Sequence, residues 1–223
     1  MSGENSALSK CMRMAEYART NSPRVSHLLK KISAAGCTLG SPEPIVCEDV
    51  FDGARVAGAY DHSRRLVVMN PSTPESFMNQ GEWTRAVAHE LVHAYDSCRA
   101  KVDPDDCRHV ACTEVRAANL SGDCDFGPEL GRVGPSRLLL SGLAAHQQAC
   151  VRRRAQLSLS MHPKCISQTI PSSSSASTPR VNRDTHGGVV GGGGKGGDDE
   201  MVVKTVASVF DACYSDWAPF STN

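Results

Sequence analysis

The sequence has little of what would mark a membrane-spanning or nucleic-acid-binding protein. Its 24 basic and 24 acidic residues give a net charge of zero, and such a balance argues against a surface built to bind a polyanion. No apolar run approaches the roughly 18 residues needed to cross a bilayer. Aromatic residues make up only 5% of the chain, although hydrophobic residues reach 40%, which is enough for a core. We therefore expect a globular protein that binds no nucleic acid.

The N-terminal residues also lack the usual targeting patterns. They contain neither the apolar centre of a signal peptide nor an Arg-rich amphipathic transit helix, so we expect no cleaved targeting segment. Two short Cys-x-x-Cys pairs, the usual sign of a structural zinc site, are absent as well. A metal site in this chain would therefore need ligands other than paired cysteines.

Cysteine is abundant instead, with ten residues spread widely along a chain of 223. This is a high number for a cytosolic enzyme, and the wide spacing is typical of disulfides. The pattern predicts several disulfides and an oxidising compartment, but spacing alone does not give the pairing. Because no secretory signal accompanies the cysteines, they point to a compartment that imports proteins by oxidative trapping.

Turn and capping residues divide the chain into helices and a small sheet. Ser22-Pro23 begins a short amphipathic helix that Gly36 ends. Short apolar runs at 45–47 and 66–69, separated by glycines and a turn, predict two or three strands. We expect further helices at 82–96, 109–120, about 137–160 and from 202 onward. The sequence thus predicts a mostly helical, disulfide-rich α+β fold with a small sheet in its N-terminal half.

Composition changes abruptly over residues 171–200, which are rich in serine and then in glycine. Such a segment cannot bury enough apolar surface to offset its loss of conformational entropy, so we expect a disordered insert. Helical periodicity returns after it. We therefore predict a single domain over 22–223 that contains this insert and follows an N-terminal extension over 1–21.

A metal-binding motif lies within the helix expected at 82–96, where His89-Glu90-Leu91-Val92-His93 occurs. Histidines four residues apart share one face of a helix, so both imidazoles can reach the same metal ion. Zinc lowers the pKa of a bound water toward ~7, and the neighbouring Glu90 is placed to take its proton. The motif predicts one zinc ion per chain, bound by His89 and His93, with Glu90 as general base.

A catalytic zinc site needs a third protein ligand. The extended motif with another histidine about six residues after the second is absent. A carboxylate on a following helix is the alternative, and Glu114 lies in a helix whose alanines permit close packing. Glu114 is the preferred third ligand, with His109 and Asp96 as competitors. If Glu114 is not a metal ligand, we expect it to form an ion pair with a nearby arginine.

Several segments of the sequence resemble one known family. HELVHAYDSCR, HVACTEVRAANLSGDC and HQQACVRRRAQLSL occur in this order, and FDACYSDWAPF follows near the C-terminus. They are similar to the mitochondrial inner-membrane zinc metalloproteases that process ATP synthase subunit 6. The resemblance implies a zincin-like fold, with His89 and His93 as metal ligands and Glu90 as general base.

The same resemblance implies a location and a substrate. Members of that family act at the inner membrane on its intermembrane-space side, and they remove the N-terminal leader of a polypeptide, subunit 6 of the Fo sector. They also assist Fo assembly, and their cysteines are oxidised on import. For this chain we expect peripheral membrane association. The alternative is an assembly chaperone that retains the fold and the metal but acts by binding.

Two groups of charged or titratable residues have no part in this motif. The basic run Arg152-Arg153-Arg154 is interpreted as a solvated helix face, with contact to anionic lipid headgroups as the alternative. The remaining histidines show no spacing typical of ligands and are interpreted as surface or capping residues. These histidines are His27, His62, His146, His162 and His186.

Overall fold

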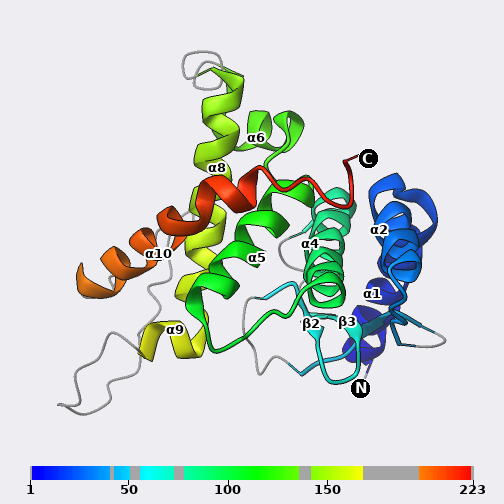
Figure 1. Cartoon of the computed structure of the whole chain (residues 1–223). Coiled ribbons are helices and arrows are strands. Elements are labelled where there is room, and N and C mark those ends of the chain that lie inside the picture. The colour runs from blue at the N-terminus through cyan, green and yellow to red at the C-terminus, as the bar shows by residue number, and fades with distance from the viewer. Residues whose placement is uncertain are drawn as a thin grey trace, which may run out of the picture.

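The computed structural model describes residues 2–40, 43–50, 56–72, 78–135, 142–167 and 196–221. The small sheet lies at one edge of the molecule against α1 and α4, and α4 and α5 lie side by side at the centre (Figure 1). The elements are α1 (Ser2–Asn21), α2 (Pro23–Ala34), β1 (Ile45–Cys47), β2 (Gly58–Asp61), β3 (Leu66–Met69), α4 (Gln80–Arg99), α5 (Cys107–Leu120), α6 (Phe126–Val133), α8 (Leu143–Ser160), α9 (Pro163–Ser167) and α10 (Gly196–Tyr214). The predicted α+β class with a small N-terminal-half sheet is confirmed.

The sheet has three strands in the order β1-β3-β2. The central strand β3 runs parallel to β1 and antiparallel to β2, with Val67 opposite both Ile45 and Tyr60. Its residues Val67 and Met69 are fully buried, as expected for a strand with neighbours on both sides. Strand β2 has a single partner in the described sheet, and its outer edge faces α4.

The helix α4 begins at a well-defined cap. The Asn79 side chain accepts a hydrogen bond from the Glu82 backbone N–H, and the Glu82 carboxylate accepts one from the Asn79 N–H. This reciprocal capping box satisfies two otherwise unpaired donors at the helix start. Trp83, Val87 and Leu91 then follow at helical spacing and are fully buried. One face of α4 is thereby fixed against the core.

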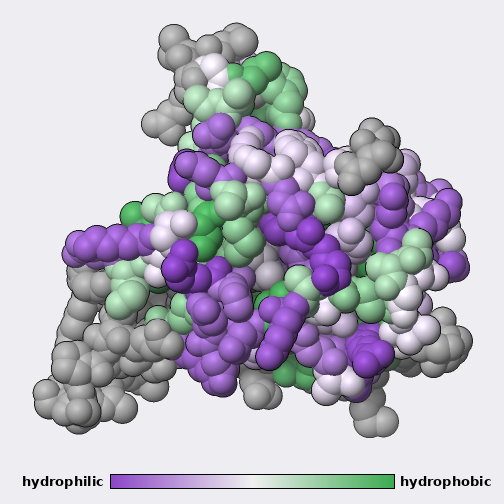
Figure 2. All heavy atoms as spheres, viewed as in Figure 1, coloured by the Kyte–Doolittle hydropathy of each residue, from purple (hydrophilic) through white to green (hydrophobic). Residues whose placement is uncertain are grey.

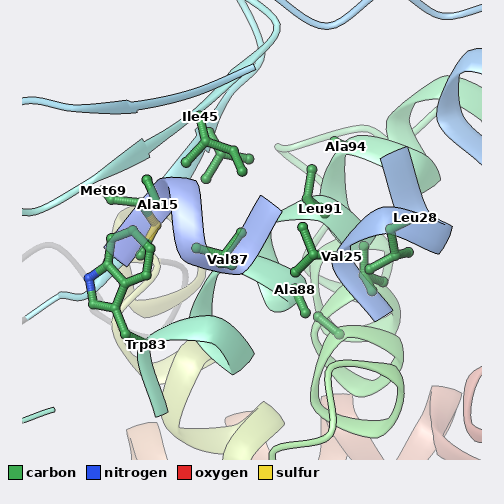
Figure 3. Packing of buried hydrophobic residues seen from close by; sticks show 14 of the residues in the cluster. Ala15, Val25, Leu28, Ile45, Met69, Trp83, Val87, Ala88, Leu91 and Ala94 are labelled. Atoms are coloured by element: carbon green, nitrogen blue, oxygen red, sulfur yellow. The ribbon is translucent and has the colours of Figure 1, made fainter. Parts of the chain in front are cut away.

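The first of two groups of buried residues, here called the N-terminal cluster, joins α1, α2, the sheet and α4. Figure 3 shows Trp83 and Val87 of α4 beside Ala15 of α1, with Leu91 nearer Val25 of α2. The cluster comprises Cys11, Met14, Ala15, Ala18, Val25, Leu28, Ile32, Ile45, Val67, Met69, Trp83, Val87, Ala88, Leu91, Val92, Ala94, Ala117 and Leu120.

Residues 1–21 take a larger part in this cluster than an extension would. The sequence predicts that the domain begins at residue 22, whereas α1 buries Cys11, Met14 and Ala18 in the N-terminal cluster. Cys11 is also bonded to Cys47 of β1. Helix α1 therefore packs as part of the same core.

The second group, here called the C-terminal cluster, joins α5, α8, α9 and α10. Small residues on α5 let α8 and α10 pack closely against it. The cluster comprises Val110, Ala111, Val115, Ala118, Cys124, Cys150, Val151, Ala155, Leu159, Cys165, Val202, Val206, Phe210 and Cys213. Phe210 is its one buried aromatic residue within the described ranges.

All ten cysteines are paired, which confirms the prediction of several disulfides. Two bonds lie in the N-terminal half, and three connect α5 and the turn after it to α8, α9 and α10. The pairs are Cys11–Cys47, Cys37–Cys98, Cys107–Cys165, Cys112–Cys213 and Cys124–Cys150.

Most of the insert expected over 171–200 lies outside the described residues. Its last residues, 196–200, belong to the first turns of α10. Across the described ranges we find no helix with the length and apolar character that a bilayer span requires. Hydrophobic residues on the face shown in Figure 2 occur in separate areas, at the α6–α8 end and beside α10.

Candidate metal centre

Helix α4 presents its two motif histidines on the side turned toward α5. Their ring centroids lie 4.9 Å apart, with an angle of 73° between the ring planes. Both side chains are only about one-sixth exposed. Because the opposite face of α4 is fixed in the N-terminal cluster, the helix holds both imidazoles at one place.

Helix α5 brings Glu114 between these two rings. Its Oε2 lies 3.3 Å from Nε2 of His89, and its Oε1 lies 3.5 Å from Nε2 of His93. One ligand atom from each residue can be chosen so that all three lie within 4.8 Å of one another. Because the fully buried Ala111 and Ala117 have small side chains, α5 can pack closely against its neighbours. The structure thus brings together the three residues that the sequence nominates as ligands.

The chemistry of this donor set fits a divalent metal ion. Two imidazole nitrogens and one carboxylate are the donors of a known type of catalytic zinc site. Oε2 of Glu114 is buried and makes no well-aligned hydrogen bond, and an unpaired buried carboxylate oxygen is costly. Burial alone would raise the pKa of Glu114, but His93 and His89 lower it to about 2. Glu114 is therefore ionised and ready to bind a cation.

Glu90 lies beside this cluster, turned toward the sheet. Its Oε2 accepts a hydrogen bond of 3.0 Å from the backbone N–H of Tyr60 on β2. Burial and, to a smaller degree, the nearby charge of Glu114 raise the pKa of Glu90 to about 7, against the opposing effect of His93. A carboxylate with such a pKa can both accept and return a proton near neutral pH.

Residues 9–176 match the model of the Peptidase M76 family. This match covers three quarters of the chain. The chain belongs to the peptidase M76 family. No solved structure matches this M76 chain significantly.

Proteins named as mitochondrial inner membrane proteases are among the relatives of this M76 chain. A Danio rerio protein named mitochondrial inner membrane protease ATP23 homolog is 35% identical, over 95% of this chain and 66% of its own length. The Homo sapiens protein of the same name is 35% identical, over 95% of this chain and 69% of its own. A Coccidioides immitis mitochondrial inner membrane protease ATP23 is 36% identical over 70% and 61%. The chain thus spans about two thirds of the length of these relatives.

The two competing ligand candidates of this M76 chain have other partners. His109 is half exposed at the start of α5, where its Nδ1 accepts a hydrogen bond from the Asp103 N–H. Asp96 is buried and pairs with Arg116 on α5. Neither belongs to the group formed by His89, His93 and Glu114.

The Asp96 pair belongs to a buried ionic network that sequence reasoning missed. Nε of Arg116 lies 2.9 Å from Oδ2 of Asp96, and Nη1 of Arg116 lies 2.8 Å from Oδ2 of Asp216. Arg116 also donates to the backbone carbonyls of Asp216 and Ala218. The network joins α4, α5 and the C-terminal segment close to the ligands. No local pattern reveals it, because its members come from three distant segments.

Two of the histidines interpreted as surface or capping residues lie in more constrained positions. His62, in the turn after β2, has its Nδ1 3.3 Å from the Ser97 hydroxyl. Burial and, to a smaller degree, the charge of His93 lower the pKa of His62. His146 is largely buried and lies 2.7 Å from Glu129. The spacing of histidines along the chain does not predict these contacts, because they form only when distant segments pack together.

The basic run of this M76 chain is engaged in intramolecular contacts. Arg154 pairs with Asp123, and Arg153 lies 3.4 Å from Glu129. The Arg152 guanidinium lies 3.3 Å from the centre of the Phe210 ring. The three side chains nevertheless remain 38%, 54% and 39% exposed, so they form a solvated helix face that also makes these contacts. Contact with anionic lipid headgroups stays a hypothesis.

Proposed function

We propose that this chain is a zinc-dependent endopeptidase. One zinc ion would be held by His89, His93 and Glu114, and Glu90 would act as general base. The observation that carries the proposal is the meeting of three suitable ligand atoms within 4.8 Å, beside a buried carboxylate. Membership of a peptidase family supports the same conclusion.

In the proposed mechanism, some residues of the site bind the metal ion and Glu90 transfers protons. A bound zinc ion would supply Lewis acidity, which acidifies water and polarises a carbonyl. The Tyr60 N–H holds Oε2 of Glu90 in place. We assign Oε1 of Glu90 to take the proton of the attacking water and then deliver it to the leaving amine. The pKa of about 7 suits both transfers.

The names of the relatives support a more specific role. We propose that this chain acts at the mitochondrial inner membrane as a peripheral protein on the intermembrane-space side. Five disulfides are consistent with that oxidising location. The substrate we propose is the N-terminal leader of ATP synthase Fo subunit 6, with assistance to Fo assembly as an associated role. A chaperone that acts only by binding would have no chemical use for Glu90.

The proposal is tested by cleavage of a quenched-fluorescent peptide that spans this leader, with the oxidised, zinc-loaded protein. Glu90→Gln removes the base with little change of shape, so we expect kcat to fall by roughly 10²–10⁴-fold. Glu200→Gln makes the same change at an exposed position on α10 and should leave cleavage unchanged. Full activity of Glu90→Gln would overturn the proposed mechanism. Loss of cleavage with preserved Fo assembly would separate proteolysis from an assembly role.

A further inference from the structure

A cavity of about 230 Å³ lies near the candidate metal centre, although neither the proposed ligands nor Glu90 are part of its lining. It lies between the C-terminal half of α4, the turn that joins β2 to β3, and the segment after α2. The lining residues used below are Tyr60, His62, Arg65, Ala94 and Ser97.

The cavity lies further along α4 from the proposed general base, toward the C-terminal end of the helix. Ala94 and Ser97 follow Glu90 by four and seven residues, so they extend its face of α4 by two turns. On the opposite wall, Tyr60 contributes the backbone N–H that binds Glu90. The two walls meet where Oγ of Ser97 lies 3.3 Å from Nδ1 of His62. A peptide that runs from Glu90 toward the C-terminal end of α4 would therefore bring one of its side chains to this cavity.

The lining of the cavity carries one positive charge, that of Arg65, and no carboxylate. His62 also lines the cavity, but its lowered pKa favours the neutral imidazole near pH 7. Among the described residues, Arg65 takes part in no ion pair, whereas the adjacent Arg64 binds both Glu48 and Asp61. The charge of Arg65 is therefore available to a ligand.

The backbone at Arg65 fixes where its side chain leaves the turn. Its φ of 55° lies in the left-handed region, where a side chain is unfavourable, and it is the one such non-glycine residue in the described ranges. The Gly40 N–H donates a 2.7 Å hydrogen bond to the Arg65 carbonyl and holds the turn in place. A left-handed residue commonly closes a short hairpin loop, and here it gives Arg65 a defined position at the cavity.

We propose that this cavity binds an acidic side chain of the peptide substrate next to the scissile bond, with Arg65 as the residue that selects it. The proposal rests on the proposed function. Tyr60, His62 and Ser97 add hydrogen-bonding groups around the same cavity. The ligand class is thus a side-chain carboxylate, Asp or Glu, of an extended peptide.

The test is a positional series of quenched-fluorescent leader peptides that carry Glu, Gln or Lys at each position around the cleavage site. For wild type we expect kcat/KM to be about tenfold or more higher with Glu than with Gln at one of these positions. Arg65→Gln should abolish this preference, and Arg65→Glu should reverse it toward Lys. Arg13→Gln, an exposed arginine on α1 outside the cavity, is the matched control and should retain it.

A binding measurement separates failure of this inference from failure of the proposed function. Fluorescence anisotropy with Glu90→Gln reports the affinity for the same peptides without cleavage. Glu90→Gln should bind the Glu peptide more tightly than the Gln peptide, and the Glu90→Gln/Arg65→Gln double variant should bind the two equally. This result would support binding of the acidic side chain in the cavity even if no peptide is cleaved. Equal cleavage and equal binding of the Glu, Gln and Lys peptides would overturn it.

Discussion

The N-terminal and C-terminal clusters lie on either side of the candidate metal centre and are stabilised by different means. The N-terminal cluster buries large side chains such as Trp83, Leu28 and Ile32 around a sheet. The C-terminal cluster is built largely from valine, alanine and cysteine, and three disulfides connect its segments. In a chain with few aromatics, covalent bonds therefore supplement the core where buried apolar surface is smallest.

The candidate site depends on both clusters. His89 and His93 come from α4, whose opposite face lies in the N-terminal cluster, whereas Glu114 comes from α5, which packs mainly in the C-terminal cluster. A change in either cluster can therefore separate the ligands. The predictions below begin at the contact between the clusters and then compare their interiors.

The largest effect on stability is expected from Arg116→Ala. Arg116 is 1% exposed, and its removal leaves Asp96 charged and buried without its main partner. Breaking a buried pair in this way costs about 3–5 kcal/mol of unfolding free energy. Urea unfolding measures the loss. The double variant Asp96→Asn/Arg116→Met should recover part of it, and a loss below about 1 kcal/mol in Arg116→Ala would show that the clusters are joined by other contacts.

Removal of single disulfides should distinguish the two clusters. Cys112–Cys213 closes 101 residues, whereas Cys11–Cys47 closes 36. Replacement of either pair by alanine should cost about 2–5 kcal/mol, and the longer loop should cost about 1 kcal/mol more. Urea unfolding of both double variants measures the difference. A greater loss from the Cys11/Cys47 pair would contradict the view that the C-terminal cluster relies more on its disulfides.

A smaller, pH-dependent effect is expected from Glu129, which packs beside α8. Burial opposes its ionisation, but Arg132, His146 and Arg153 outweigh it and lower the pKa. Because the folded-state pKa lies below that of the unfolded chain, the stabilisation is complete above the unfolded pKa. It is lost as the pH falls through the folded value.

The corresponding measurement is the melting temperature of wild type and Glu129→Gln between pH 7 and pH 3. We expect Glu129→Gln to be less stable than wild type at pH 7 and the difference to shrink on acidification. Glu43→Gln, at an exposed position before β1, is the matched control. A constant difference between wild type and Glu129→Gln at all pH values would exclude this role for Glu129.

Local patterns in the sequence predict most of the secondary structure. Capping residues and apolar periodicity place the helices now described as α2, α4 and α5, and short apolar runs place β1 and β3. Helix α1 lies in the segment that the sequence predicts as an extension, yet its buried residues Cys11, Met14, Ala15 and Ala18 follow one helical face. This pattern in the sequence is the signal that α1 packs in the core.

Local sequence patterns predict only part of the candidate site. The spacing of His89 and His93 is local, and the structure places Glu114 beside them. The Tyr60 N–H that holds Glu90 and the partners of Arg116 belong to segments brought together only by folding. The same holds for the disulfide pairing, because many arrangements of ten cysteines agree with one sequence.

The central claim is that α4 and α5 together form one metal site, and the zinc content of the purified protein tests it most directly. We expect about one zinc ion per chain in wild type and in His109→Gln, the matched control on α5. Glu114→Gln should lose most of the metal while remaining folded by circular dichroism. Equal zinc content in wild type and Glu114→Gln would contradict the claim, as would a folded, oxidised wild-type protein that binds no zinc.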